Sequence, residues 1–212
     1  MAIIVTYTDL QLAIADYAAR SDLTAQIPGF IDLVEASLNG DPDFRLPQMQ
    51  AFTTLTPGMD GSAALPADFL EMRNVTWTGS PSHSLPYVDY RYLQDRNPDQ
   101  INGNALMFSI NDGFLYTSPV DQTSLKVGYW QLIPPLASNP TNWLITAYPN
   151  VYLFGALLEL YAFVQDANKA QAWGARFADF KEKLRRSAMT SIGPMAMRPS
   201  VPINDGPRAS WF

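Results

Sequence analysis

The sequence has no cysteine and only one histidine, His83. Without thiols, disulfides, thiolate nucleophiles and thiolate-bound zinc are excluded, and the chain suits assembly in a reducing cytoplasm. No second histidine is available for a metal site or a triad, and no nucleophile-elbow pattern accompanies this one. Because it stands between Pro81 and Pro86, we interpret His83 as a solvated loop residue.

Long hydrophobic runs are also missing. The most apolar stretch, residues 151–164, is interrupted by Glu159 and is shorter than the roughly 18 apolar residues that suggest a membrane span. Residues 1–6 lack a basic segment followed by an apolar core of signal-peptide length. We therefore expect no export signal and no membrane partner.

Positive charge is scarce in most of the chain. Residues 1–165 hold 6 basic and 16 acidic side chains, whereas residues 166–212 hold 8 basic and 4 acidic ones. An acidic body repels phosphate, so we expect no stable nucleic-acid binding by the bulk of the protein. The basic end could bind an acidic protein surface, including the acidic body of a neighbouring copy.

Five carboxylates are the candidates for chemistry: Asp41, Asp43, Asp60, Asp68 and Glu71. Glycosidases use a carboxylate pair, and clusters of carboxylates bind divalent cations. Prolines break the segments around these residues, and the ladder of oxygen ligands of a calcium loop is absent. We therefore predict turn and capping roles, with no catalytic, cofactor or metal site. A polymer hydrolase using carboxylates among Asp60, Asp68 and Glu71 stays open as an alternative.

Helical spacing appears at both ends of the chain. Thr8 and Gln11 fit a capping box for a first helix, and Pro28 suits the first turn of a second helix that stops at Gly40. Pro149 is placed to open a helix that runs to about residue 164, and Asp166 or Asn168 to open another. The expected buried faces are Leu10, Ala13, Ile14, Tyr17 and Ala18; Phe30, Ile31, Val34 and Leu38; and Trp173, Phe177, Phe180 and Leu184.

The middle of the chain predicts strands, because Pro and Gly recur at short intervals between clusters of β-formers. The expected strands are residues 51–56, 72–78, 106–110, 114–117 and 125–130. Asn111-Asp112-Gly113 is a strong tight-turn signal between the third and fourth strands, and residues 87–95 suit a short helix.

These patterns predict an α+β fold. Residues 1–48 and 132–190 form a helical bundle, residues 49–131 form an inserted small antiparallel β domain, and residues 191–212 form an extended, proline-rich C-terminal arm. The prolines of the arm forbid a helix and most sheet pairing, yet its apolar residues are unusual for a disordered tail. We infer a segment that orders on a partner through Pro194, Met195, Met197, Pro199, Val201, Pro202, Ile203, Pro207, Trp211 and Phe212.

The aromatic content, 26 of 212 residues, suits protein interfaces as well as a core. One aromatic segment, NPTNWLITAYPNVYLFGALLE at 139–159, followed by AWGARF at 172–177, resembles the C-terminal helix pair of tailed-bacteriophage head-to-tail adaptor (connector) proteins. Segments 7–11, 28–36 and 65–73 extend the resemblance over most of residues 5–187. Asn150 and Phe154 replace the usual Asp and Tyr, and the arginine that often follows the second-helix motif is missing.

The resemblance implies a non-enzymatic virion protein of the neck, made in the host cytoplasm. Such adaptors form a twelve-fold ring beneath the portal, contact tail or nozzle proteins, and leave a channel through which DNA passes without specific binding. The matched residues then have packing roles: Tyr148-Pro149 sets a helix angle, Gly155 and Ala156 allow close helix approach, and Tyr152 and Trp143 pack on the outer turn. Trp173 completes this packing motif. Another neck or tail-completion protein is the closest alternative.

Overall fold

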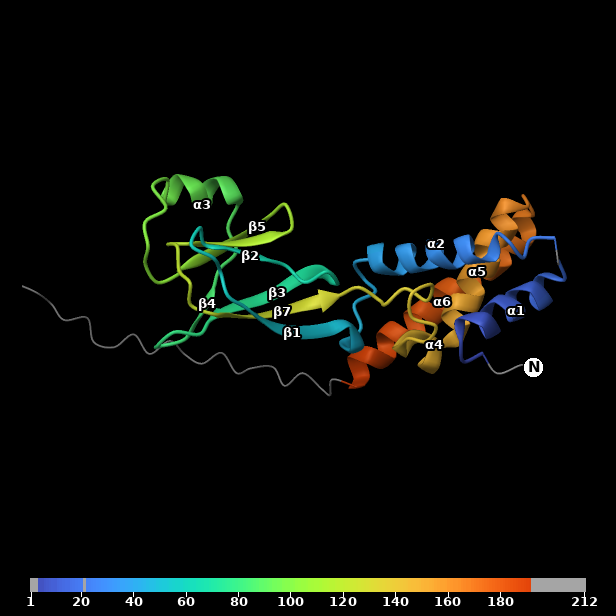
Figure 1. Cartoon of the computed structure of the whole chain (residues 1–212). Helices are drawn as coiled ribbons and strands as arrows, with labels where there is room; N and C mark the ends of the chain where they lie inside the picture. Colours follow the sequence, from blue (N-terminus) through green and yellow to red (C-terminus); the bar gives the residue numbers. More distant parts are fainter. Residues whose placement is uncertain (1–3, 21, 192–212) are drawn as a thin grey trace, which may run out of the picture.

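The computed structural model describes residues 4–20 and 22–191. Two lobes follow one another along a single long axis (Figure 1). The helical lobe comprises the described residues up to 49 and residues 132–191, and the β lobe comprises residues 50–131. Because the chain enters the β lobe once and returns once, the helical lobe joins helices from both ends of the sequence. The predicted α+β fold class is confirmed, while the predicted arm from residue 192 onward lies outside the described residues.

The first helix, α1 (Tyr7–Ala18), begins two residues earlier than the capping prediction implied. The N-terminal cap is Thr6, whose hydroxyl accepts a hydrogen bond from the Asp9 backbone N–H at 3.2 Å. The Asp9 carboxylate in turn accepts from the Thr6 N–H at 3.0 Å. The prediction of Thr8 and Gln11 is therefore wrong, because Asp serves here in the position usually held by Glu or Gln.

Helix α2 (Ile27–Gly40) has Pro28 in its first turn, as predicted. It packs its apolar stripe against α5 (Pro149–Phe163), which is the central helix of this lobe. Apolar residues surround α5 on nearly every side, which is the pattern of a helix covered by other helices. Helix α6 (Ala167–Ser191) packs along another side of α5. The five-residue α4 (Trp143–Ala147) directly precedes α5 in the chain.

The β lobe contains two antiparallel sheets packed face to face. The first has the order β1-β7-β3-β4 and the second β2-β6-β5. The strands are β1 (Gln50–Leu55), β2 (Ser62–Ala64), β3 (Phe69–Trp77), β4 (His83–Leu85), β5 (Met107–Asn111), β6 (Phe114–Ser118) and β7 (Leu125–Gln131). Val75, Leu115 and Val127 belong to the core between the sheets. The short α3 (Tyr90–Arg96) covers β5 and β6 (Figure 1).

The predicted tight turn is confirmed. Asp112 and Gly113 connect β5 to β6 with φ of 48° and 78°. Positive φ at both central positions is the requirement of a type I′ hairpin turn, whose twist matches that of the flanking strands. The sequence therefore specifies this hairpin locally.

Candidate functional site

Within the segment that carries the adaptor resemblance, Asn142 caps α4. The Asn142 side-chain oxygen accepts from the Ile145 N–H at 2.8 Å, and the backbone carbonyl of Asn142 accepts from the Thr146 hydroxyl at 2.8 Å. Tyr148 ends α4 with φ −141° and ψ 57°, and Pro149 begins α5 directly after it. The residue before a proline avoids helix, so this pair fixes the angle between two consecutive helices.

Tyr152 lies at the centre of a buried polar network. Its hydroxyl accepts from the Asn142 amide at 2.8 Å and is 3.4 Å from the Glu35 carboxylate, to which it can donate. The same Glu35 oxygen accepts from the Leu136 N–H at 2.9 Å. Tyr152 is fully buried, so the prediction that it packs on the outer turn is wrong. Sequence spacing misses the network because its members come from α2, the 132–142 segment and α5.

Burial dominates the electrostatics of this network. Glu35 is only 6% exposed, and this burial raises the pKa of its carboxyl although the Leu136 N–H and the Tyr152 hydroxyl stabilise the charged form. Burial likewise raises the pKa of the Tyr152 hydroxyl. A signal for Glu35 exists in the sequence, because it stands four residues after Ile31 and three before Leu38 on a predicted buried face.

Gly155 marks the closest packing of three helices. A Cβ there would lie 2.8 and 2.9 Å from the two methyls of Val34 on α2 and 3.1 Å from the ring of Phe177 on α6. Any side chain at this position would push neighbouring helices apart. The predicted role of Gly155 in close helix approach fits these distances.

The two tryptophans of the packing motif lie in different surroundings. Trp173 on α6 is half-buried, with its ring centroid 5.7 Å from that of Phe154 and 6.1 Å from that of Tyr17. The guanidinium of Arg176 lies 4.7 Å from the Trp173 ring centroid. Trp143 buries its indole N–H without a hydrogen-bond partner among the described residues.

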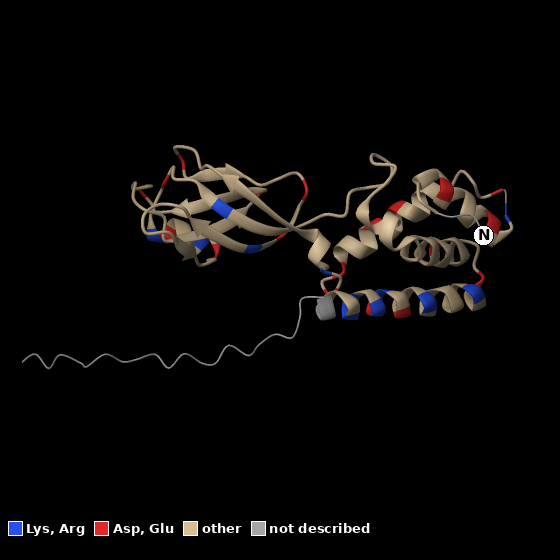
Figure 2. Cartoon of the chain, turned by 90° about the horizontal axis from the view of Figure 1, so that it is seen from below, with Lys and Arg blue, Asp and Glu red and all other residues tan. Residues whose placement is uncertain are grey.

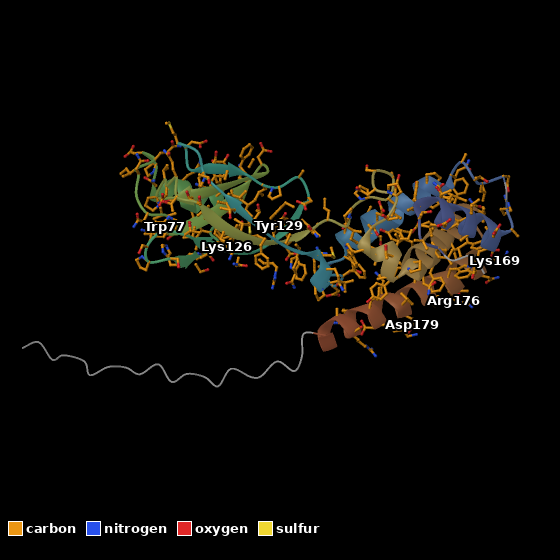
Figure 3. All side chains as sticks on the ribbon, turned by 60° about the horizontal axis from the view of Figure 1, so that its bottom comes forward. Trp77, Lys126, Tyr129, Lys169, Arg176 and Asp179 are labelled. Carbon is orange, nitrogen blue, oxygen red and sulfur yellow. The ribbon has the colours of Figure 1, made fainter. Side chains whose placement is uncertain are left out.

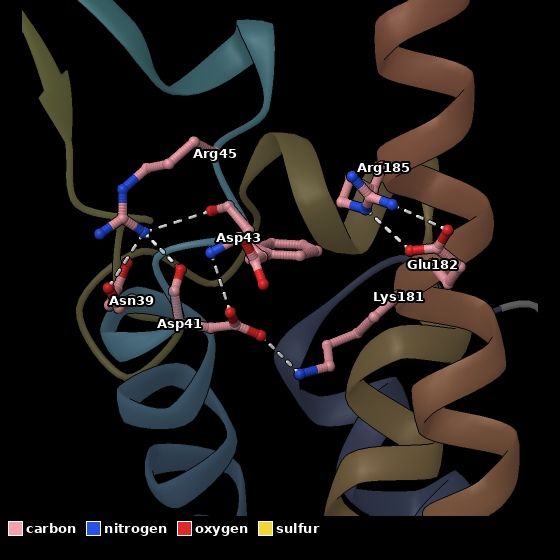
Figure 4. A network of polar contacts seen from close by, with 8 residues as sticks. Asn39, Asp41, Asp43, Arg45, Lys181, Glu182 and Arg185 are labelled. Atoms are coloured by element: carbon pink, nitrogen blue, oxygen red, sulfur yellow. Dashed lines mark hydrogen bonds and ion pairs between the residues drawn. The ribbon is translucent and has the colours of Figure 1, made fainter.

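A polar junction joins the end of α2 to α6 (Figure 4), and its Arg45 also reaches β3 of the β lobe. The Arg45 guanidinium donates to the Asp41 carbonyl at 2.7 Å and to the Glu71 carboxylate of β3 at 3.1 Å. Lys181 of α6 pairs with the Asp41 carboxylate at 2.7 Å. Burial works to raise the pKa of Asp41, but the hydrogen bonds from Lys181 and the Asp43 N–H, with the charges of Lys181 and Arg45, lower it overall. These contacts hold the β lobe against the end of α2.

The outer face of the four-stranded sheet is open to solvent. Phe52 is 63% exposed, and its ring lies over Gly128, where a Cβ would be 2.9 Å from it. Lys126, labelled in Figure 3, is exposed in β7 between Thr54 and Thr76 of the neighbouring strands. Lys126 makes no ion pair with any residue in the described ranges, so its charge is available to a partner.

The three carboxylates of the hydrolase alternative serve separate structural roles. Asp60 accepts from the Ser62 hydroxyl at 2.8 Å, Asp68 accepts from the Tyr129 hydroxyl at 3.0 Å, and Glu71 pairs with Arg45. A cavity of about 380 Å³ is lined by Asp60, but neither Asp68 nor Glu71 lines it. The geometry therefore gives no support to a carboxylate pair that acts on a polymer.

His83 does not lie in a solvated loop, and that interpretation is wrong. It lies in β4, half-buried, with its ring centroid 5.0 Å from that of Trp77 and its Nε2 2.9 Å from the Ala105 carbonyl oxygen. The prolines suggested a loop, but a three-residue strand fits between them. Within residues 4–20 and 22–191, no group of three His, Asp or Glu residues could hold a metal ion.

In the same described ranges, no helix is both long enough and apolar enough to cross a bilayer. The residues predicted to bind a partner, Pro194 to Phe212, lie outside these ranges, so the structure places none of them. The six packing residues, in contrast, all lie in the helical lobe, on α4, α5, α6 and the α4–α5 junction.

Comparison with known families agrees with this geometry. A family model described as SU10 adaptor protein matches residues 5–198, a range that includes nearly all of both lobes. No curated protein matches the chain. Because the family match covers most of the sequence, the chain belongs to the SU10 adaptor family, a family of phage head-to-tail adaptors.

Proposed function

We propose that this chain assembles with further copies into a ring of about twelve subunits that joins the portal to the tail and leaves a channel for DNA. The observation that carries the proposal is the family match over residues 5–198. A phage head-to-tail adaptor is a structural protein of the virion neck, with partners in the portal and the tail in general, and such adaptors are generally not enzymes.

The charge distribution supports a channel role. With 16 acidic and 6 basic side chains in residues 1–165, the body of each subunit offers little attraction to phosphate. DNA could slide past such a surface without binding to it, because the favourable term in non-specific DNA binding comes from basic side chains.

The junction between the lobes supports a subunit of fixed shape. Besides the Arg45–Glu71 contact, the Leu132 N–H donates to the Asp68 carbonyl of the β lobe at 2.8 Å. The next residue is anchored within the helical lobe, because the Ile133 N–H donates to the Asn39 side chain at 3.0 Å. A ring closes at a defined copy number only if each subunit keeps the angle between its two contact surfaces. An elongated body with a fixed junction meets that requirement.

The test combines the purified full chain with portal-bearing capsids. Electron microscopy is expected to show a ring of about a dozen copies at the portal vertex, and light scattering is expected to give the matching mass for any ring that forms in solution. A single copy at the vertex would contradict the proposal. Binding to tail parts but not to the portal would favour another neck or tail-completion protein.

The C-terminal arm provides a second test. We propose that the arm residues Met195, Met197, Val201, Ile203, Trp211 and Phe212, with the four prolines, order on the portal or on an adjoining subunit. Deleting residues 192–212 should leave a folded subunit, measured by circular dichroism, that no longer binds portal particles. Binding as tight as that of the full chain would reject this role of the arm.

A further inference from the structure

The helical lobe carries charge of opposite sign on different sides. Apart from the buried Glu35, residues 7–40, which include α1 and α2, hold four acidic side chains and one basic side chain, whereas α6 holds six basic and two acidic ones. Figure 2 shows α6 along one margin of the lobe with most of its Lys and Arg positions, and Asp and Glu positions on helices across from it. One subunit thus presents two complementary surfaces.

The central helix α5 keeps these surfaces apart. It packs against α6 on one side and against α2 and α1 on others, while α1 and α2 have few direct contacts with α6. Across α5, Lys181 of α6 pairs with Asp41 just beyond α2, while Asp16, Asp32 and Arg176 form no ion pair in the described part of the chain. A ring needs two different patches on each copy, one for each neighbour, since only head-to-tail contacts close around an axis.

On the basis of the ring proposed above, we propose that the acidic face of one subunit docks on the basic face of the next. The acidic face is the exposed side of α1 and α2, defined by Leu12, Asp16, Asp32 and Leu33. The basic face is the exposed side of α6, defined by Ala172, Ala175, Arg176, Asp179, Lys183 and Arg186. The occupant of each face is a second copy of this chain.

Several charges on these faces lack an ion-pair partner within the subunit. Asp16 and Asp32 are exposed, and neither forms an ion pair with any described residue. Arg176 is exposed, stacks on Trp173, and likewise has no carboxylate partner in the described part of the chain. The α6 side of the contact also includes Lys183, which pairs with Asp179 at 2.6 Å on its own helix. Unpaired charges of opposite sign steer two protein surfaces toward each other and fix their relative position.

Apolar contacts would accompany the charges. Leu12 is 62% exposed and Leu33 is 53% exposed, so two large apolar side chains project from the acidic face. On α6, Ala172 and Ala175 are exposed beside Arg176 and leave room for a larger side chain from a neighbour. A core of leucine on alanine with charges around it matches the usual anatomy of a protein interface.

The basic face suits a protein better than a nucleic acid. Its cations alternate with Asp179 and Glu182 along α6, and Glu182 is bonded to Arg185 and Arg186 at 2.7 Å. Hydrogen bonds from these two arginines hold the pKa of Glu182 at about 2. Phosphates approaching α6 would therefore meet fixed carboxylates, whereas the carboxylates of another subunit can pair with selected cations.

Charge reversal tests the contact, because reversing one face should weaken assembly and reversing both faces should restore it. The first variant carries Asp16→Lys and Asp32→Lys, and the second carries Arg176→Glu and Lys183→Glu. Each variant alone places like charges across every proposed contact, and its ring assembly at the portal should weaken at least about tenfold. Light scattering and electron microscopy with portal-bearing capsids measure the assembly.

An equimolar mixture of the two variants should assemble again. In alternating order, each reversed acidic face meets a reversed basic face, and each native face meets a native one. A chain that carries all four substitutions should assemble as well. Failure of both the mixture and the fourfold variant would overturn the proposed pairing of faces. A loss of portal binding that is confined to the second variant and is not rescued would also overturn it, and would assign α6 to the portal instead.

Two controls separate specific effects from general ones. Reversing exposed charges on the β lobe, Asp99→Lys with Arg91→Glu, should leave assembly unchanged; an equal loss there would overturn the assignment to these faces. If a reversal variant does not fold, the neutral set Asp16→Asn, Asp32→Asn and Arg176→Gln decides, and it should weaken assembly more at low salt than at high salt. If wild type forms a ring and single reversals assemble as tightly, the pairing fails while the ring stands. If wild type forms no ring, both proposals fail.

Discussion

The helical lobe and the β lobe use their apolar residues differently. In the helical lobe the largest apolar and aromatic groups surround α5, and even the polar Tyr152 and Glu35 are buried there with partners. The β lobe has a smaller core between its sheets, and it exposes more large apolar side chains. Those exposed on the β lobe are Phe52, Met59, Tyr87, Tyr92, Ile101, Leu106 and Phe114.

This difference separates two roles within one subunit. Close packing around α5 gives the helical lobe a single arrangement, because interiors packed to crystal-like density tolerate little change. An exposed aromatic surface on the β lobe is instead the composition that protein partners bind. The aromatic segment 139–159 that resembles the adaptor motif lies in the helical lobe, which explains why its matched residues are packing residues.

The largest expected effect comes from filling the tightest contact of the helical lobe. Gly155→Val should destabilise the protein by about 3 kcal/mol, because its side chain would collide with Val34 and Phe177. Chemical denaturation measures the loss. Gly174→Ala is the matched control on α6: its Cβ meets only Leu158 at 3.4 Å, so it should stabilise the helix by about 0.5–1 kcal/mol. Equal effects of the two substitutions would show that α5 is less tightly packed than these distances require.

The second effect compares one hydroxyl in each lobe. Tyr152→Phe should cost about 1–3 kcal/mol, since the buried Asn142 amide and Glu35 carboxylate each lose a partner. Tyr129→Phe in the β lobe removes a bond to the half-buried Asp68, which water can replace, so about 0.5–1.5 kcal/mol is expected. Thermal or denaturant unfolding ranks the pair, and a larger cost at Tyr129 would contradict the stated difference between the lobes.

Local signals in the sequence predicted much of the fold. Residues that act through near neighbours were the predictable ones: Pro28 and Pro149 at helix starts, Asp112-Gly113 in a hairpin, and the β-rich runs that became the five longer strands. The three-residue β2 was missed because it exists only by pairing with β6 far along the chain, and β4 was missed because the prolines around it suggested a loop. The Glu35 network and the Arg45 junction were missed for the same reason as β2, since each includes a contact between residues separated by 26 or more positions.

A third, smaller effect tests the openness of the β lobe. Gly128→Ala places a methyl 2.4 Å from the Asn74 side-chain oxygen and 2.9 Å from the Phe52 ring. These distances are as short as those at Gly155, but both neighbours are side chains on the solvent face and Phe52 can turn outward. The cost should be about 1 kcal/mol or less, measured by denaturant unfolding. A loss as large as that of Gly155→Val would mean that Phe52 is held as firmly as a core residue.

The smallest effect depends on pH and distinguishes two glutamates. The pKa of Glu35 is raised by burial, so its folded state favours the protonated form and loses stability as the pH rises from the unfolded value of about 4.3 through the folded one. Glu35→Gln keeps an oxygen acceptor for Leu136 and Tyr152 without the charge. Its melting temperature should match that of wild type in acid, exceed it as the pH rises from the unfolded pKa through the folded one, and keep that lead at higher pH.

Glu182 provides the opposite sign on the same lobe. Its pKa is held at about 2 by Arg185 and Arg186, so its contribution is present above the unfolded value and is lost as the pH falls toward 2. Glu182→Gln should therefore melt below wild type at neutral pH, with the difference closing in acid. Because Glu182 is part of an exposed network, added salt should shrink its effect and leave that of Glu35 nearly unchanged. Two pH profiles of the same sign would contradict the assignment of one carboxylate to the interior and the other to the surface.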